Sequence, residues 1–80
     1  MLSPSHRTRR ARLALAAAGF DRRHVAVHST ARKTVVSWSA PAVPARILDV
    51  LDAEAFGTPF WYWYPYHGTI TYWRPRPAQP

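Results

Sequence analysis

The sequence predicts a small α+β protein: a two-layer sandwich in which two helices cover one face of an antiparallel sheet of about four strands, in the order αββαββ. Its 80 residues allow one small domain. Hydrophobic residues make up 48% of the chain and aromatic residues 14%, too many for a disordered basic tail. Segments of helical periodicity alternate with segments of two-residue periodicity, which gives the element order. We assign residues 1–74 to a single basic domain and residues 75–80 to an extended proline-rich tail.

The first twenty residues predict a helix. Ser3 or Ser5 supplies an N-cap, and Gly19 supplies a stop. Small apolar residues recur at helical spacing and would let this helix lie close to a sheet: Ala11, Ala14, Leu15 and Ala18.

The same segment also resembles the start of an export signal, because the paired Arg9 and Arg10 precede an apolar run. That run, residues 13–18, is shorter than the roughly 7–15 residues of a signal core. The chain has no cysteine, whereas small secreted scaffolds usually need disulfides. We therefore expect a cytoplasmic protein, with a cleaved signal as the alternative.

From Arg22 the pattern changes to a period of two, with Val25 and Val27 on one face and His24, Ala26 and His28 on the other, which predicts a half-buried strand. After a short connection at residues 29–32, residues 33–38 resume the β-branched and aromatic pattern, so the two segments predict a hairpin.

The second half predicts a helix followed by another hairpin. Pro41 and Pro44 form a turn and a helix entry, residues 45–56 follow helical periodicity, and Gly57 ends the helix. Residues 60–66 and 69–74 then predict two strands around a turn at residues 67–68. Pro65 lacks an N–H, so the first of these strands should lie at a sheet edge or carry a bulge. Similar tripeptides begin at Ala11 and Ala45, which hints at two αββ halves.

The basic residues are concentrated at the start of the chain. The formal net charge is +7, and eight of the eleven basic residues lie in positions 1–33 beside one acid, Asp21. Arginines near a helix N-terminus interact unfavourably with the helix dipole, so we expect that they are not required for folding. We predict that these residues contact nucleic-acid phosphates: Arg7, Arg9, Arg10, Arg12, Arg22, Arg23, Arg32 and Lys33. The alternative is a solvated, solubilising end of the molecule.

Seven aromatic residues occupy the thirteen positions 61–73. Because strand residues alternate, Trp61 and Trp63 share one face, which we place inward, and Phe60 and the tyrosines share the other. We predict that Tyr62, Tyr64 and Tyr66 form a stacking surface for bases or a hot spot for a protein partner. The alternative is that all seven pack in the core or across a homodimer.

No residue pattern predicts catalysis, a metal or a cofactor. In the inferred strand His24 and His28 would lie about 13 Å apart, too far to chelate one ion. There is no nucleophile elbow, paired-carboxylate motif, P-loop or dinucleotide fingerprint. No apolar run approaches the roughly 20 residues of a membrane span, so we expect no membrane partner.

Residues from about 20 to 56 resemble one of the large polyvalent-protein-associated domain families of phages and conjugative elements. The shared features are two short strands, with Trp38 leading to Pro41, followed by a helix that ends near Phe56. Where the family has a Thr-Asp-Gly-Pro-like turn after the tryptophan, this chain has Ser39, Ala40 and Pro41. The resemblance implies a mobile-element protein that acts inside a bacterial cell, and it carries over no catalytic residue.

These observations lead to a functional prediction. We expect a small non-enzymatic binding module of a phage or mobile element that engages nucleic acid or a nucleoprotein complex through its basic helix and aromatic hairpin. The alternative is an inhibitor that binds a host defence or regulatory protein. A homodimer through the exposed aromatic strand is a third interpretation.

Overall fold

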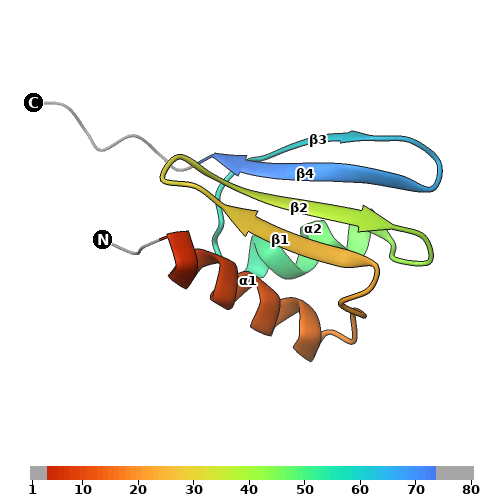
Figure 1. Ribbon diagram of the computed structural model, residues 1–80, viewed down its shortest axis with the longest axis horizontal. Helices are drawn as coiled ribbons and strands as arrows, with labels where there is room; N and C mark the ends of the chain where they lie inside the picture. The colour runs from red at the N-terminus through yellow and green to blue at the C-terminus, as the bar shows by residue number, and fades with distance from the viewer. Residues whose placement is uncertain (1–3, 74–80) are drawn as a thin grey trace, which may run out of the picture.

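The computed structural model describes residues 4–73. Figure 1 shows two helices on one side of a four-stranded antiparallel sheet. The elements are, in order, α1 (Pro4–Ala17), β1 (Val25–Ser29), β2 (Lys33–Ser39), α2 (Pro44–Ala53), β3 (Pro59–Trp63) and β4 (His67–Trp73). The strands follow one another across the sheet as β1-β2-β4-β3, so β1 and β3 are its edges. The predicted two-layer α+β architecture and element order are confirmed, while Ser3 and the tail at residues 75–80 lie outside the described residues.

Both helices end in the same hydrogen-bonded cap. After α1, Gly19 adopts a φ of 91°, its N–H donates to the Ala16 carbonyl at 3.0 Å, and the Phe20 N–H donates to the Leu15 carbonyl at 3.0 Å. This pair of bonds is a Schellman motif. Gly19 therefore ends the helix as predicted, whereas Ser5 lies within α1 and is not its N-cap.

The cap of α2 shows why this helix is shorter than predicted. Ala55 has a φ of 56°, its N–H donates to the Asp52 carbonyl at 3.0 Å, and the Phe56 N–H donates to the Leu51 carbonyl at 3.3 Å. The prediction that the helix extends to Phe56 is wrong, because the left-handed residue at 55 turns the chain after Ala53.

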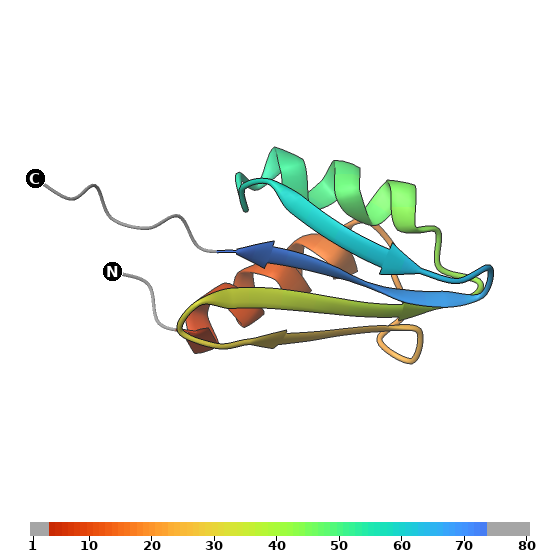
Figure 2. The same ribbon diagram turned by 90° about the horizontal axis from the view of Figure 1, so that it is seen from above.

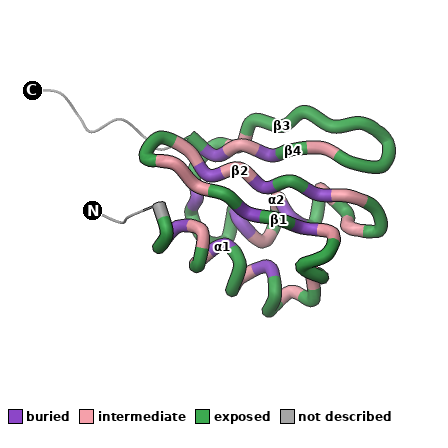
Figure 3. Tube along the Cα trace, in the orientation of Figure 1, coloured by how far each residue is buried: buried purple, intermediate pink, exposed green. Residues whose placement is uncertain are grey.

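The core lies between the helices and the sheet. In Figure 3 the buried residues alternate along β1, β2 and β4, while β3 is exposed along nearly its whole length. The predicted inward positions of Val25 and Val27 are confirmed, and α1 contributes Ala11 and Leu15 from the predicted small-residue stripe. The remaining core residues come from the second helix, the connection that follows it and the two central strands: Val36, Trp38, Ile47, Leu51, Phe56, Ile70 and Tyr72.

The second hairpin turns earlier than predicted. The Tyr64 N–H donates to the His67 carbonyl at 2.7 Å, which leaves Pro65 and Tyr66 as the turn. His67 and Gly68, predicted to be the turn, belong to β4 instead, and Gly68 lies opposite Trp63. A side chain at 68 would overlap the Cβ of Trp63, so this close crossing of strands requires glycine. The prediction of an edge strand is confirmed for β3, which ends before Pro65.

The two αββ halves are arranged about an approximate twofold axis. The central strands β2 and β4 are antiparallel, and their pairing is centred on Val36 opposite Ile70, which lie 34 positions apart. The hairpin registers of β1–β2 and β3–β4 are related by the same shift. The helix caps are instead related by a shift of 36 positions, because Phe20 and Phe56 make the equivalent hydrogen bond in the two caps. The connection from helix to strand is therefore two residues shorter in the second half.

The two caps predict opposite effects from opposite substitutions. Gly19→Ala should lower the free energy of unfolding by about 1–2 kcal/mol, because an L-residue is disfavoured at positive φ. Ala55→Gly should raise it by about 0.5–1 kcal/mol, because it relieves the same penalty at the matching position. Urea denaturation of both variants measures this, and a change of the same sign in both would contradict the shared cap geometry.

The buried Tyr72 predicts a difference in stability between the wild type and a phenylalanine variant, and this difference should depend on pH. Tyr72 is fully buried, its hydroxyl has no hydrogen-bond partner among the described residues, and burial together with the charge of Asp52 raises its pKa to about 12. Tyr72→Phe should raise the stability at pH 7 by about 1 kcal/mol, because it removes a buried, unsatisfied polar group.

The same substitution should change the alkaline side of the stability curve. A folded pKa above the unfolded value of 10.0 means that the wild type loses stability as the pH rises from about 10 through about 12. The phenylalanine variant lacks this contribution, so its advantage in melting temperature should widen across that window. A constant difference between pH 8 and pH 11.5 would contradict this assignment.

Candidate nucleic-acid interface

Two arginines of α1 converge on one aromatic ring. The guanidinium carbons of Arg7 and Arg10 lie 4.8 and 4.2 Å from the centroid of the Phe56 ring. Arg7 is buried, and its Nε donates to Thr34 Oγ1 at 3.0 Å. Arg10 Nη2 donates to the carbonyl oxygen of Glu54 at 2.8 Å, beyond the last turn of α2. Both side chains are therefore part of the packing between α1, α2 and the sheet.

An arginine of α2 makes the equivalent contact with the end of α1. The guanidinium carbon of Arg46 lies 5.1 Å from the centroid of the Phe20 ring, and Arg46 Nη2 donates to the carbonyl oxygen of Ala18 at 3.0 Å. Each helix thus sends one arginine to the carboxyl end of the other, where the helix dipole favours a cation. We call the contacts of Arg10 with Phe56 and of Arg46 with Phe20 the reciprocal arginine clamp.

We expected that the arginines of the first helix are not required for folding, and this expectation is wrong for three of them. Arg7 and Arg10 hold Phe56, and Arg12 Nη2 donates to the carbonyl oxygen of Val27 at 3.3 Å. These partners offset the unfavourable position of the arginines at the start of a helix. Arg9 is solvent-exposed and stays a candidate for an external contact.

The four remaining predicted basic residues lie at opposite ends of β1. Arg22 and Arg23 belong to the connection before it, whereas Arg32 and Lys33 follow it. Arg23 Nη2 lies 2.8 Å from the Asp21 carboxylate, and hydrogen bonds from Arg23 lower the pKa of Asp21 to about 2. The eight predicted residues therefore do not form one continuous surface.

The sheet has one face that the helices do not cover. Figure 2 looks onto this face, with both helices behind the strands. We call it the open face, and strand register places these residues on it: Ala26, His28, Lys33, Val35, Ser37, Ser39, Phe60, Tyr62, Tyr64, His67, Thr69, Thr71 and Trp73. None of the four acidic residues, all of which are within the described segment, lies on a strand.

Large aromatic side chains gather on the open face along β3 and the end of β4. Phe60 is 68% exposed, Tyr62 62%, Tyr64 50% and Trp73 52%. We call these four residues the aromatic row. The hydroxyls of Tyr62 and Tyr64 lie 3.0 Å apart, and their rings meet edge to face at 5.4 Å between centroids. The hydrogen bond to Tyr62 raises the pKa of Tyr64 above its ordinary value. Lys33 Nζ lies 5.1 Å from the centroid of the Trp73 ring.

The opposite orientation of the tryptophans is confirmed, but they are only partly buried. Trp61 and Trp63 lie on the helix-facing side, with their rings stacked 5.5 Å apart, and Trp63 meets Trp38 edge to face at 6.1 Å. Trp61 is 48% exposed because it lies on the edge strand. The alternative that all seven aromatic residues of positions 61–73 pack in the core is wrong. Of these seven, only Tyr72 is buried in the described part of the chain.

The placement of Tyr66 differs from the prediction. β3 ends at Trp63, and Tyr66 lies in the turn, where its carbonyl accepts a hydrogen bond from the Ala40 N–H at 2.7 Å. Tyr66 is 73% exposed but does not extend the alternation of Tyr62 and Tyr64. A proline at 65 ends the ladder before the tyrosine is reached, which is why the shared-face prediction is wrong there.

Within residues 4–73, no three His, Asp or Glu side chains lie together as a group that would hold a metal ion. His28 and His67 both lie on the open face, on β1 and β4 respectively. In the same part of the chain, neither helix has the length and apolar character needed to cross a membrane.

A scan of protein-family models, a search of curated proteins and a search of solved structures each found no match to this chain.

The reciprocal arginine clamp predicts that its arginines are stability determinants. Arg10→Ala and Arg46→Ala should each lower the free energy of unfolding by about 1–2 kcal/mol, because each removes a cation–π contact and a hydrogen bond to a helix-end carbonyl. Arg9→Ala, on the same helix as Arg10 but exposed, is the matched control and should change stability by less than about 0.5 kcal/mol. Guanidinium denaturation measures all three, and equal losses for Arg9 and Arg10 would refute the clamp.

Proposed function

We propose that the protein is a non-enzymatic module that binds nucleic acid on the open face of its sheet. The observation that supports this most strongly is the aromatic row, four large aromatic side chains exposed by half or more on a face that no helix covers. Exposed aromatic rings on a sheet are a common platform for stacking bases, and each stacked base contributes about 1–3 kcal/mol.

The charges around the aromatic row suit a phosphate backbone. Lys33 lies over Trp73 on the open face, and the exposed Arg32 precedes it in the β1–β2 turn. His28 and His67 add imidazole nitrogens that can hydrogen-bond to a ligand on the same face. The acidic side chains belong to α2 and the connections, so carboxylates of the described strands do not repel a polyanion.

A single strand fits this surface better than a duplex. Bases paired in a helix present only their edges, whereas unpaired bases offer their faces to rings such as Tyr62. Side chains from β2 and β4, exemplified by Lys33 and Thr71, flank the row with groups that would contact bases and phosphates without reading a fixed sequence. We therefore assign single-stranded DNA or RNA as the ligand class, free or within a nucleoprotein complex.

The proposed setting is the cytoplasm of a bacterial cell that carries a phage or mobile element. It follows from the resemblance at residues 20–56, a segment that comprises β1, β2 and α2 and so joins parts of both halves. The second candidate, an inhibitor of a host protein, is favoured by the same exposed tyrosines, which are frequent hot-spot residues. A pulldown from host lysate with and without nuclease separates the two, because a protein retained after nuclease treatment supports the inhibitor.

The aromatic row predicts how variants change oligonucleotide affinity. Tyr62→Ala or Phe60→Ala should weaken binding of a labelled 12-nucleotide single strand about 5- to 100-fold, because each removes one stacking ring. Tyr66→Ala removes an exposed tyrosine from the turn and is the matched control, with little change expected. Fluorescence anisotropy measures the three affinities on DNA and RNA.

Two comparisons decide the proposal. Affinity should be higher for the single strand than for its duplex, and it should fall between about 50 and 200 mM salt as counterions are released. Absence of binding at the lower salt, binding without salt dependence, or equal losses for Tyr62 and Tyr66 each reject the open face as a nucleic-acid surface.

A further inference from the structure

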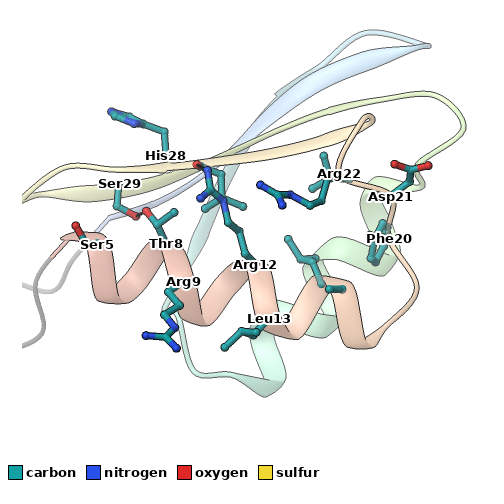
Figure 4. Close-up of a pocket in the computed structure, with 14 residues that line it drawn as sticks. Ser5, Thr8, Arg9, Arg12, Leu13, Phe20, Asp21, Arg22, His28 and Ser29 are labelled. Atoms are coloured by element: carbon teal, nitrogen blue, oxygen red, sulfur yellow. Dashed lines mark hydrogen bonds between the residues drawn. The ribbon is translucent and has the colours of Figure 1, made fainter.

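A second surface lies on the other side of the molecule, between α1 and the free edge of β1. It is an open groove of about 710 Å³, a volume typical of ligand sites. Figure 4 shows Arg12 reaching from α1 towards β1, and Arg22 projecting into the groove from the connection that follows Phe20. A hydrogen bond of 2.8 Å from Thr8 Oγ1 to Ser29 Oγ bridges its two walls at one end.

The main chain of β1 has a free edge along this groove. The Ser39 N–H donates to the His24 carbonyl at 2.8 Å, and residues of an antiparallel strand alternate between bonded and non-bonded pairs. Ala26 and His28 therefore bond to β2, whereas the N–H and C=O groups of Val25 and Val27 point away from it. The contact of Arg12 Nη2 with the Val27 carbonyl at 3.3 Å shows that this free edge faces α1.

The walls of the groove combine apolar and cationic groups. Val25, Val27 and Leu15 form its inner lining, and the exposed Leu13 lies on the α1 side. Arg9, Arg12 and Arg22 also line it.

The groove has little negative charge to oppose these arginines. Among residues 4–73, Asp21 is the only carboxylate that lines it. Arg23 already binds this carboxylate, and hydrogen bonds from Arg23 lower the pKa of Asp21. The groove therefore presents uncompensated positive charge beside a free strand edge.

We propose that the α1–β1 groove binds an extended peptide with acidic side chains, which adds to β1 as a fifth strand of the sheet. The peptide main chain would pair with the outward groups of Val25 and Val27 and would displace Arg12 Nη2 from the Val27 carbonyl, so that Arg12 and Arg22 could both bind the peptide carboxylates. A segment of about five residues matches the length of β1. This proposal is independent of nucleic-acid binding, because it uses neither the aromatic row nor the open face.

A peptide accounts for features that a phosphate backbone does not use. Phosphates would bind Arg12 and Arg22 without needing an apolar wall or a free strand edge. Strand addition uses both: main-chain hydrogen bonds give affinity, and pockets for alternate side chains give specificity. The spacing of outward groups at Val25 and Val27 fits every second residue of such a strand.

The test uses a capped seven-residue peptide of alternating Glu and Val and the full chain labelled with ¹⁵N. Titration should shift the amide signals of Val25 and Val27 saturably, and leave those of the aromatic row in place. Arg22→Ala should weaken the peptide at least fivefold, whereas Arg32→Ala, which removes an exposed arginine outside the groove, should leave its affinity unchanged. Thermal denaturation of each variant shows that it remains folded.

Two further peptides test the mode of binding. N-methylation of one alternate set of residues should abolish binding and methylation of the other set should not, because only one set of N–H groups faces β1. A Lys-Val peptide should not bind. Equal effects of the two methylated peptides, no saturable shift with the Glu-Val peptide, or its displacement by a 12-nucleotide single strand would each overturn the proposal, the last by making the groove a nucleic-acid site.

Discussion

The reciprocal arginine clamp joins the two helices, one from each half, on the side of the molecule where the pairing of β2 with β4 does not connect the halves. Arg10 and Arg46 each bind a carbonyl at the end of the opposite helix and stack on the phenylalanine that follows it. Each contact thus joins one αββ half to the other. A chain of 80 residues without cysteine buries a small core and has no disulfide to hold its helices, so such contacts carry a larger share of its stability than in a larger domain.

Much of the fold could be predicted from the sequence because local periodicity reports which side of an element is buried. The alternation at Val25 and Val27 and the stop at Gly19 are of this kind, and both are confirmed. The clamp could not be predicted in this way, because two strands and a helix separate Arg10 from Phe56 in the sequence and only tertiary packing brings them together. One signal was present: Phe20 and Phe56 each follow a helix, and an arginine precedes each of them at the same spacing.

Some positions of the candidate site could likewise be predicted from local pattern, and others could not. Alternation placed Tyr62 and Tyr64 on one face correctly, since a strand has only two faces. It misplaced Tyr66, because Pro65 moves the turn by two residues. The role of the early arginines was misjudged for a physical reason: a helix-dipole argument counts the local cost of a charge, and it omits an aromatic ring or a carbonyl brought close by tertiary packing.

The division of the arginines changes what the charge of +7 implies about function. Arg7 and Arg10 are engaged within the fold, and Arg12 and Arg22 line the α1–β1 groove, so the basic residues at the start of the chain are divided between the packing of the helices and this groove. In the proposed function, recognition on the open face rests mainly on aromatic rings, with Lys33 beside the ring of Trp73. As proposed, a surface of that kind would select ligands by exposed planar groups more than by charge, whereas the groove would select them by charge and by an extended backbone. The two surfaces therefore suit different ligands.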